Sequence, residues 1–177
     1  NKVRFLRSVL EAYGVRDKYL LNTELGILCG SSGEEAQCQE EAFQLTKAHY
    51  VAAANAAAAA EGLRANVWYS LLGWRGTGLV TGGLQPLPAY DALRFSARML
   101  TGAAYVGALE QFEGVRGYEF ARDGQRLWLL WALDGAEHTL DLPVLPSEVY
   151  DVFGGVLEPA QTLTISVAPV YIVFPPE

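Results

Sequence analysis

Residues 19–28, YLLNTELGIL, decide the fold. The run is apolar apart from a short centre that carries one acidic side chain, Glu24. A compact apolar run of this kind is typical of a parallel strand that is covered on both faces. We predict a buried strand here, with its carboxyl end near Thr23 and Glu24.

Helical patterns flank this strand on both sides. Apolar residues recur at spacings of three and four within residues 1–13, which predicts a helix with one buried face. After a loop, an alanine-rich segment predicts a long helix over residues 34–61, because alanine has the highest helix propensity. Ser31 with Glu34, or Ser32 with Glu35, has the spacing of a capping box at its start.

A second strand and a third helix follow. Residues 66–72, NVWYSLL, are rich in β-formers, and Pro88 and Gly102 suit the first turn and the end of a helix. The order helix, strand, helix, strand, helix implies parallel strands joined by helical crossovers. Residues 1–102 are therefore expected to be the C-terminal part of a (β/α)₈ barrel, roughly a quarter to a third of the ~250 residues that a full barrel needs.

Residues 103–177 have a different pattern, in which short apolar runs are separated by turn signals. Asp123-Gly124 and Asp134-Gly135 lie between apolar runs and predict hairpins, and Gly154-Gly155 predicts a third turn. Pro169 is expected to limit one of the last strands to an edge or a bulge. We predict an antiparallel β-sandwich of about six to eight strands, so the fold class is α/β plus all-β.

Composition excludes several classes of function. The chain has 177 residues, 51% of them hydrophobic and 19% charged, with a net charge of −7. Without a basic surface, no nucleic-acid partner is expected. The longest weakly polar run, residues 51–60, is too short and too rich in alanine to span a membrane, so no membrane partner is expected.

The chemistry centres on Glu24. A carboxylate at the end of an apolar strand is costly to bury unless it is hydrogen-bonded or paired. In a barrel the carboxyl ends of the strands face the active site, where Glu24 would suit a nucleophile that attacks an anomeric carbon. The alternative is a structural carboxylate that only accepts hydrogen bonds.

Two tryptophans and two cysteines are the other candidates. Trp68 in the second strand and Trp74 just after it suit stacking on the C–H face of a sugar, although aromatic residues in strands are more often core. Cys29 and Cys38 form either a disulfide that fixes a loop or two free thiols, and no metal site is expected from them.

The chain also resembles a known family. KYLLNTELG at 18–26, the alanine-rich helix, NVWYSLL, GLQPLPAYDALRFSARMLTGA at 83–103 and the tail APVYI together resemble clan A glycoside hydrolases over essentially the whole chain. The resemblance implies that Glu24 is the nucleophile at the end of the seventh barrel strand and that Trp68 floors the sugar site. Thr23, which flanks Glu24, and Trp74 are the other residues expected to bind substrate, and no cofactor is expected.

This resemblance implies part of an enzyme that cleaves β-glycosidic bonds of an oligosaccharide or polysaccharide with retention. In this clan the acid/base glutamate follows the fourth strand, a region that these residues do not include, so the fragment alone is expected to be inactive. The alternative is a non-catalytic carbohydrate-binding or structural module. Expected partners are the saccharide and either the missing barrel portion or a second copy. The expected location is secreted or extracellular, and otherwise cytoplasmic.

Overall fold

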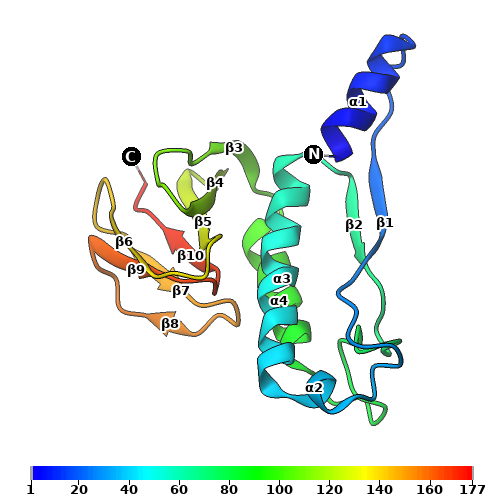
Figure 1. Cartoon of the computed structure of the whole chain (residues 1–177). Helices are drawn as coiled ribbons and strands as arrows, with labels where there is room; N and C mark the ends of the chain where they lie inside the picture. The colour runs from blue at the N-terminus through cyan, green and yellow to red at the C-terminus, as the bar shows by residue number, and fades with distance from the viewer. Residues whose placement is uncertain (1, 177) are drawn as a thin grey trace.

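The computed structural model describes residues 2–176, and the first hundred of them combine helices with a small parallel sheet. The two strands β1 and β2 pair in parallel, and α3 and α4 lie on one side of this two-stranded sheet (Figure 1). The elements in chain order are α1 (Lys2–Ala12), β1 (Leu21–Leu25), α2 (Ala36–Gln39), α3 (Glu41–Ala60), β2 (Ala65–Trp68) and α4 (Pro88–Leu100).

The long helix predicted over residues 34–61 is interrupted. Glu40 has extended backbone angles, φ −68° and ψ 146°, and separates the short α2 from the twenty-residue α3. Glu35 precedes α2 but points back into the loop, where the backbone N–H groups of Ser31, Ser32 and Gly33 donate to its carboxylate. The carboxylate therefore orders the loop, and the helix begins later than the capping-box spacing predicted.

The remaining residues form two antiparallel sheets. Six strands pair in the order β3-β4-β5-β10-β7-β8, and β6 pairs with β9. Their bounds are β3 (Ala104–Ala108), β4 (Val115–Arg122), β5 (Gln125–Ala132), β6 (His138–Asp141), β7 (Glu148–Tyr150), β8 (Val156–Leu157), β9 (Thr162–Ile165) and β10 (Val170–Val173).

The turn predictions meet different outcomes. The hairpin at Asp123-Gly124 is confirmed, since both residues have positive φ and join β4 to β5. The turn at Gly154-Gly155 joins the paired strands β7 and β8. The hairpin at Asp134-Gly135 is wrong, because β5 pairs with β10 while β6 leaves for the other sheet. Pro169 precedes β10, which is a central strand with a continuous register to both neighbours, so the expected edge or bulge is also wrong.

Two apolar clusters hold the antiparallel part together. One lies between the six-stranded sheet and α3 and α4, where the buried alanines of α3 allow close approach and Phe95 packs edge-on against Tyr171 with ring centroids 5.2 Å apart. The other lies between the two sheets and includes Trp128 and Ile165. Both faces of the six-stranded sheet are therefore covered.

The N-terminal helix lacks the buried face that its sequence predicts. α1 projects from the rest of the molecule (Figure 1), and none of its described residues is buried. Phe5 is 66% exposed, because two strands leave no continuous sheet on which the apolar stripe can pack. None of the helices within residues 2–176 is long and apolar enough to cross a membrane.

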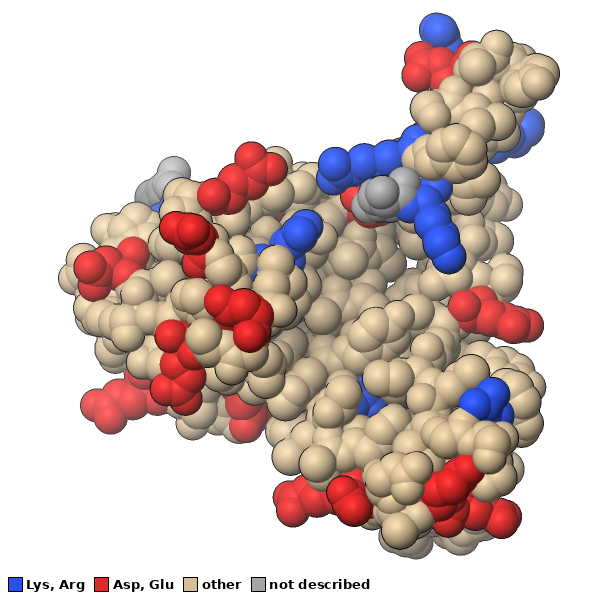
Figure 2. Space-filling model, in the orientation of Figure 1, with Lys and Arg blue, Asp and Glu red and all other residues tan. Residues whose placement is uncertain are grey.

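Charge is distributed unevenly over the surface. Figure 2 shows acidic side chains spread over the antiparallel part and basic ones gathered around α1. Arg4 on α1 pairs with Glu61 just past the end of α3, with 3.0 Å between Nε and Oε1. This pair is one of the few ties between α1 and the remaining structure.

Candidate functional site

Glu24 lies at a register irregularity in β1. Asn22 pairs with Asn66 and Leu25 pairs with Trp68, so β1 has one more residue than β2 between these two pairs. Without this bulge, strand alternation would place Glu24 on the same side as Asn22, whose amide bonds to Asn66 on the side of α3. Glu24 lies within this irregularity and is exposed.

Glu24 lines a cleft at the carboxyl ends of the two parallel strands. The cleft has a volume of about 230 Å³ and is lined by the last two residues of β1 and by residues that follow β1 and β2 in the chain: Glu24, Leu25, Gly26, Leu28, Tyr69, Trp74 and Thr77. Complete small-molecule sites measure ~300–1,000 Å³, so this cleft is the size of part of a site. Within residues 2–176, no hydrogen bond or ion pair holds the carboxylate of Glu24.

Gly26 is required where the two strand ends approach each other. A Cβ at this position would lie 2.9 Å from the carbonyl oxygen of Tyr69, which is closer than real Cβ contacts come. The absence of a side chain therefore lets the segment after β2 lie against the segment after β1. This approach brings Tyr69 and Trp74 beside Glu24.

The predicted sugar-binding residues separate in the structure. Trp74 lines the cleft and is 56% exposed, whereas Trp68 and Thr23 are not among the lining residues. Trp68 turns to the helix side, where it packs near Val51 and edge-on against Tyr50, and its indole N–H donates to the carbonyl of Thr77 at 2.8 Å.

Tyr69 is the lining residue that the sequence reasoning missed. It is 48% exposed and follows Trp68 directly, so strand alternation places it on the opposite side, with Glu24. The signal was present in the sequence as two adjacent aromatic residues. Choosing between them required the direction of β2, which the sequence does not state.

A larger hollow lies on the other side of the small sheet. It measures about 430 Å³ between α1, α3 and the strands, and alanines form much of its wall. Its carboxylate, Glu61, is already paired with Arg4. This hollow therefore offers apolar surface but no free acid or nucleophile.

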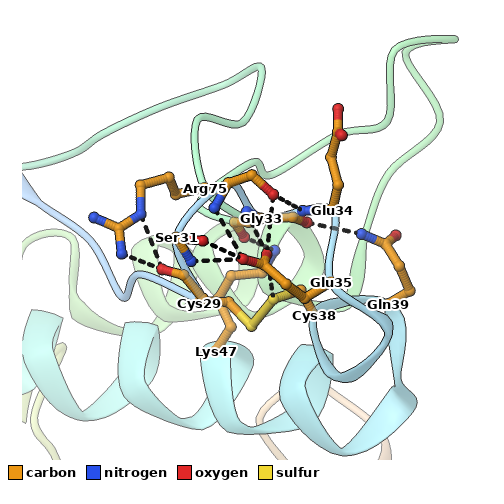
Figure 3. Close-up of a disulfide and its surroundings, with 12 residues drawn as sticks. Cys29, Ser31, Gly33, Glu34, Glu35, Cys38, Gln39, Lys47 and Arg75 are labelled. Carbon is orange, nitrogen blue, oxygen red and sulfur yellow. Dashed lines mark hydrogen bonds between the residues drawn. A yellow bond between two sulfur atoms is a disulfide. The ribbon is translucent and has the colours of Figure 1, made fainter.

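The loop beside the cleft is closed by a disulfide. Of the two alternatives for Cys29 and Cys38, the structure has the bonded one, with the Cα atoms 5.6 Å apart (Figure 3). Inside the loop, hydrogen bonds from Ser31 and Ser32 hold the pKa of Glu35 well below its usual range, the hydroxyl of Ser31 contributing most. Glu35 is thus a structural carboxylate, in contrast to the unbonded Glu24.

No cluster of metal-binding side chains accompanies these residues. Within residues 2–176, no three His, Cys, Asp or Glu side chains gather in a way that could hold a metal ion. What the cleft offers is one free carboxylate beside two exposed aromatic side chains.

Comparison with known proteins gives a likeness of fold. No protein-family profile matches the chain, and no curated protein matches its sequence. A family 39 glycoside hydrolase from the gut symbiont Bacteroides cellulosilyticus WH2 matches 98% of this chain with a TM-score of 0.75 at 16% identity. A conserved exported protein from Bacteroides fragilis matches 97% at 0.71 and 11% identity, and a GH30 endoxylanase from Clostridium papyrosolvens C71 matches 94% at 0.61 and 12% identity.

In each case this chain spans less than half of the matched structure. It covers 38% of the family 39 enzyme, 42% of the exported protein and 44% of the endoxylanase. Identities this low establish the arrangement of the backbone and leave the chemistry open. The chain therefore shares its fold with parts of larger glycoside hydrolases.

Proposed function

We propose that this chain forms the closing βα units and the β-sandwich of a retaining glycoside hydrolase that cleaves β-glycosidic bonds. The observation that carries the proposal is the position of Glu24, whose free carboxylate lies at the carboxyl end of a parallel strand in a cleft with Trp74 and Tyr69. The fold that the chain shares with glycoside hydrolases supports the same assignment.

The chemistry follows from these side chains. The carboxylate of Glu24 attacks the anomeric carbon and forms a glycosyl-enzyme ester, which water then hydrolyses. The exposed rings of Trp74 and Tyr69 offer flat apolar faces on which the C–H face of a sugar stacks. An acid/base carboxyl group, needed to protonate the leaving oxygen and to activate water, comes from βα units outside this chain.

The parallel half has open surfaces, which support the proposal that further structure packs against it. β1 and β2 each pair with one neighbour only among the described residues, which leaves both outer edges of this sheet without partners. Leu21, Val67 and Leu71 are exposed on or beside these strands. We infer that further parallel strands of a barrel cover these edges, consistent with the share of each similar structure that this chain spans.

The disulfide bears on where the protein acts. A bond between Cys29 and Cys38 persists in an oxidising environment. We propose that the protein is secreted or extracellular, where polysaccharides are also accessible.

A second function, saccharide binding without catalysis, is favoured by one observation. Among the described residues that line the cleft, Glu24 is the only acidic one. Hydrolysis with retention needs two carboxyl groups ~5–5.5 Å apart. If no second carboxyl group is supplied, the aromatic cleft can bind a sugar but cannot hydrolyse it.

Azide rescue distinguishes the two functions in a protein that joins this chain to its remaining βα units. Glu24→Ala should abolish hydrolysis of an aryl β-glycoside, and sodium azide should restore aryl release by attacking the anomeric carbon from the emptied side. The product should be the α-glycosyl azide. Restored release with a β-glycosyl azide, or undiminished hydrolysis in Glu24→Ala, would exclude Glu24 as the nucleophile.

A further inference from the structure

Lys47 is a buried cation that the proposed chemistry does not use. It lies in the second turn of α3 with 0% of its surface exposed. Buried ammonium groups are normally paired with a carboxylate. Within residues 2–176, Lys47 has no such pair, and its neighbours are the ring of Phe43 and two backbone carbonyls.

The two carbonyls belong to the turn that carries Trp74. The Nζ atom of Lys47 donates to Gly76 at 2.9 Å and to Gly78 at 2.6 Å. Hydrogen bonds to charged donors are stronger than neutral ones, and here they are made out of contact with water. Lys47 thus fixes this turn to α3 at two points.

The neighbouring carbonyls of the same turn are also occupied. The backbone N–H of Cys29 donates to the carbonyl of Arg75 at 2.9 Å, and the indole N–H of Trp68 donates to that of Thr77 at 2.8 Å. Four successive carbonyls, at residues 75–78, therefore receive donors from three separate parts of the chain. Residues 77 and 78 of this turn are buried, and donors from other parts of the chain fix the turn in place.

The loop that the disulfide closes, residues 29–38, packs against the same turn. The Nε and Nη2 atoms of Arg75 both donate to the carbonyl of Gly30. Gly33, with φ +88°, lies so close to the backbone of Arg75 and Gly76 that a Cβ would overlap it. Figure 3 shows Lys47 reaching from α3 towards this cluster. The turn is held between α3 and the loop of residues 29–38.

Trp74 lies at the N-terminal end of this restrained turn. Thr77, which is buried, donates its hydroxyl to the carbonyl of Trp74 at 2.8 Å and accepts the N–H of Trp74 at 3.2 Å. We propose that Lys47 is a positioning residue, whose hold on Gly76 and Gly78 sets Trp74 as the wall of the cleft beside Glu24. Its value for sugar binding rests on the proposed function, whereas its hold on Trp74 does not.

Fluorine NMR of the chain labelled with 5-fluorotryptophan tests this assignment. The four tryptophans give four signals, and Trp74→Phe identifies the signal of Trp74. Lys47→Met keeps an unbranched side chain that is one atom shorter and removes the charge and all donors. It should shift the Trp74 signal by more than its linewidth, move the signal of Trp68, and leave Trp128 and Trp131 unchanged.

Ala56→Gly is the matched control, because Ala56 is fully buried on α3 but packs in the cluster between α3, α4 and the six-stranded sheet. It should weaken the helix without moving the Trp74 signal. If Lys47→Met does not fold, Lys47→Gln, which is neutral but keeps an NH₂ donor, replaces it.

An unchanged Trp74 signal in a folded Lys47 variant would overturn the proposal. So would an equal shift in Ala56→Gly, or loss of the Trp128 and Trp131 signals in both Lys47 variants, since Lys47 would then support the whole fold. No saccharide enters this experiment, so its outcome is independent of whether Glu24 is a nucleophile.

Discussion

The antiparallel and parallel halves of the molecule differ in how far each covers its own apolar surface. The six-stranded sheet has α3 and α4 on one face and the β6–β9 sheet on the other, and most of its large side chains are buried. In the parallel half, α1 has no buried residue among those described, and β1 and β2 leave Leu21 and Val67 exposed. The first half has both faces of its main sheet covered by described residues, whereas the second has surfaces suited to further βα units.

The largest expected effect on stability comes from replacing one phenylalanine by alanine in each half. Phe120 in β4 is 0% exposed, so Phe120→Ala should lower the free energy of unfolding by about 3–5 kcal/mol. Phe5→Ala on α1 is the matched control and should change it by less than about 0.5 kcal/mol. Urea denaturation followed by circular dichroism measures both, and equal losses would show that α1 is packed in solution.

A pH effect of about 3 kcal/mol is expected from Lys47. Burial lowers the pKa of its ammonium from 10.5 to about 8. Between these two values the unfolded chain holds a proton that the folded chain has released, so the free energy of unfolding should rise with pH across this interval.

Tyrosines and other lysines also titrate in that range, so the contribution of Lys47 is the difference between the wild type and Lys47→Met. Urea midpoints at pH 8 and pH 10.5 give this difference. Parallel pH dependences of the two proteins would show that Lys47 is not desolvated.

Removing the disulfide should have an effect of about 2–3 kcal/mol, because the loop between Cys29 and Cys38 is short. The loss of the disulfide should also affect the two halves differently. In Cys29→Ser/Cys38→Ser, hydrogen exchange should speed up in the turn at residues 73–78 and stay unchanged in β4 and β5. Uniform acceleration in both halves would contradict a local role for this loop.

The smallest effect concerns association. The exposed apolar side chains of α1 and the open edges of β1 and β2 should make the chain self-associate at high concentration. Val9→Ser with Phe5→Ser should raise the monomer fraction in sedimentation velocity without lowering stability. A wild type that stays monomeric over the same concentrations would show that these surfaces need no cover.

The sequence predicted helices, strands and turns better than it predicted which strands pair. The alternation of helices and strands and the hairpin at Asp123-Gly124 follow from local periodicity and turn chemistry. Asp134-Gly135 misled because a turn dipeptide specifies a reversal of the chain but not whether the next strand stays in the same sheet. Pro169 misled in the same way, since it restricts its own position and not the strand that follows.

The position of the candidate acid was predictable from the sequence, and its role stays a proposal. Glu24 was identified from its position at the end of an apolar strand, and Trp74 from its place just after the next one. Tyr69 was missed, and Trp68 preferred, because the bulge in β1 and the direction of β2 depend on pairing between distant residues. Lys47 carries no sequence signal, since a lysine in a helix is ordinarily exposed.

The most direct measurement of the central claim is covalent labelling of the protein that joins this chain to its remaining βα units. A 2-deoxy-2-fluoro β-glycoside with a good leaving group should form a stable ester, and mass spectrometry of the digest should find it on Glu24. The label should be absent from Glu24→Gln. A label on any other residue, with Glu24 unmodified, would contradict the assignment of this cleft as the site of nucleophilic attack.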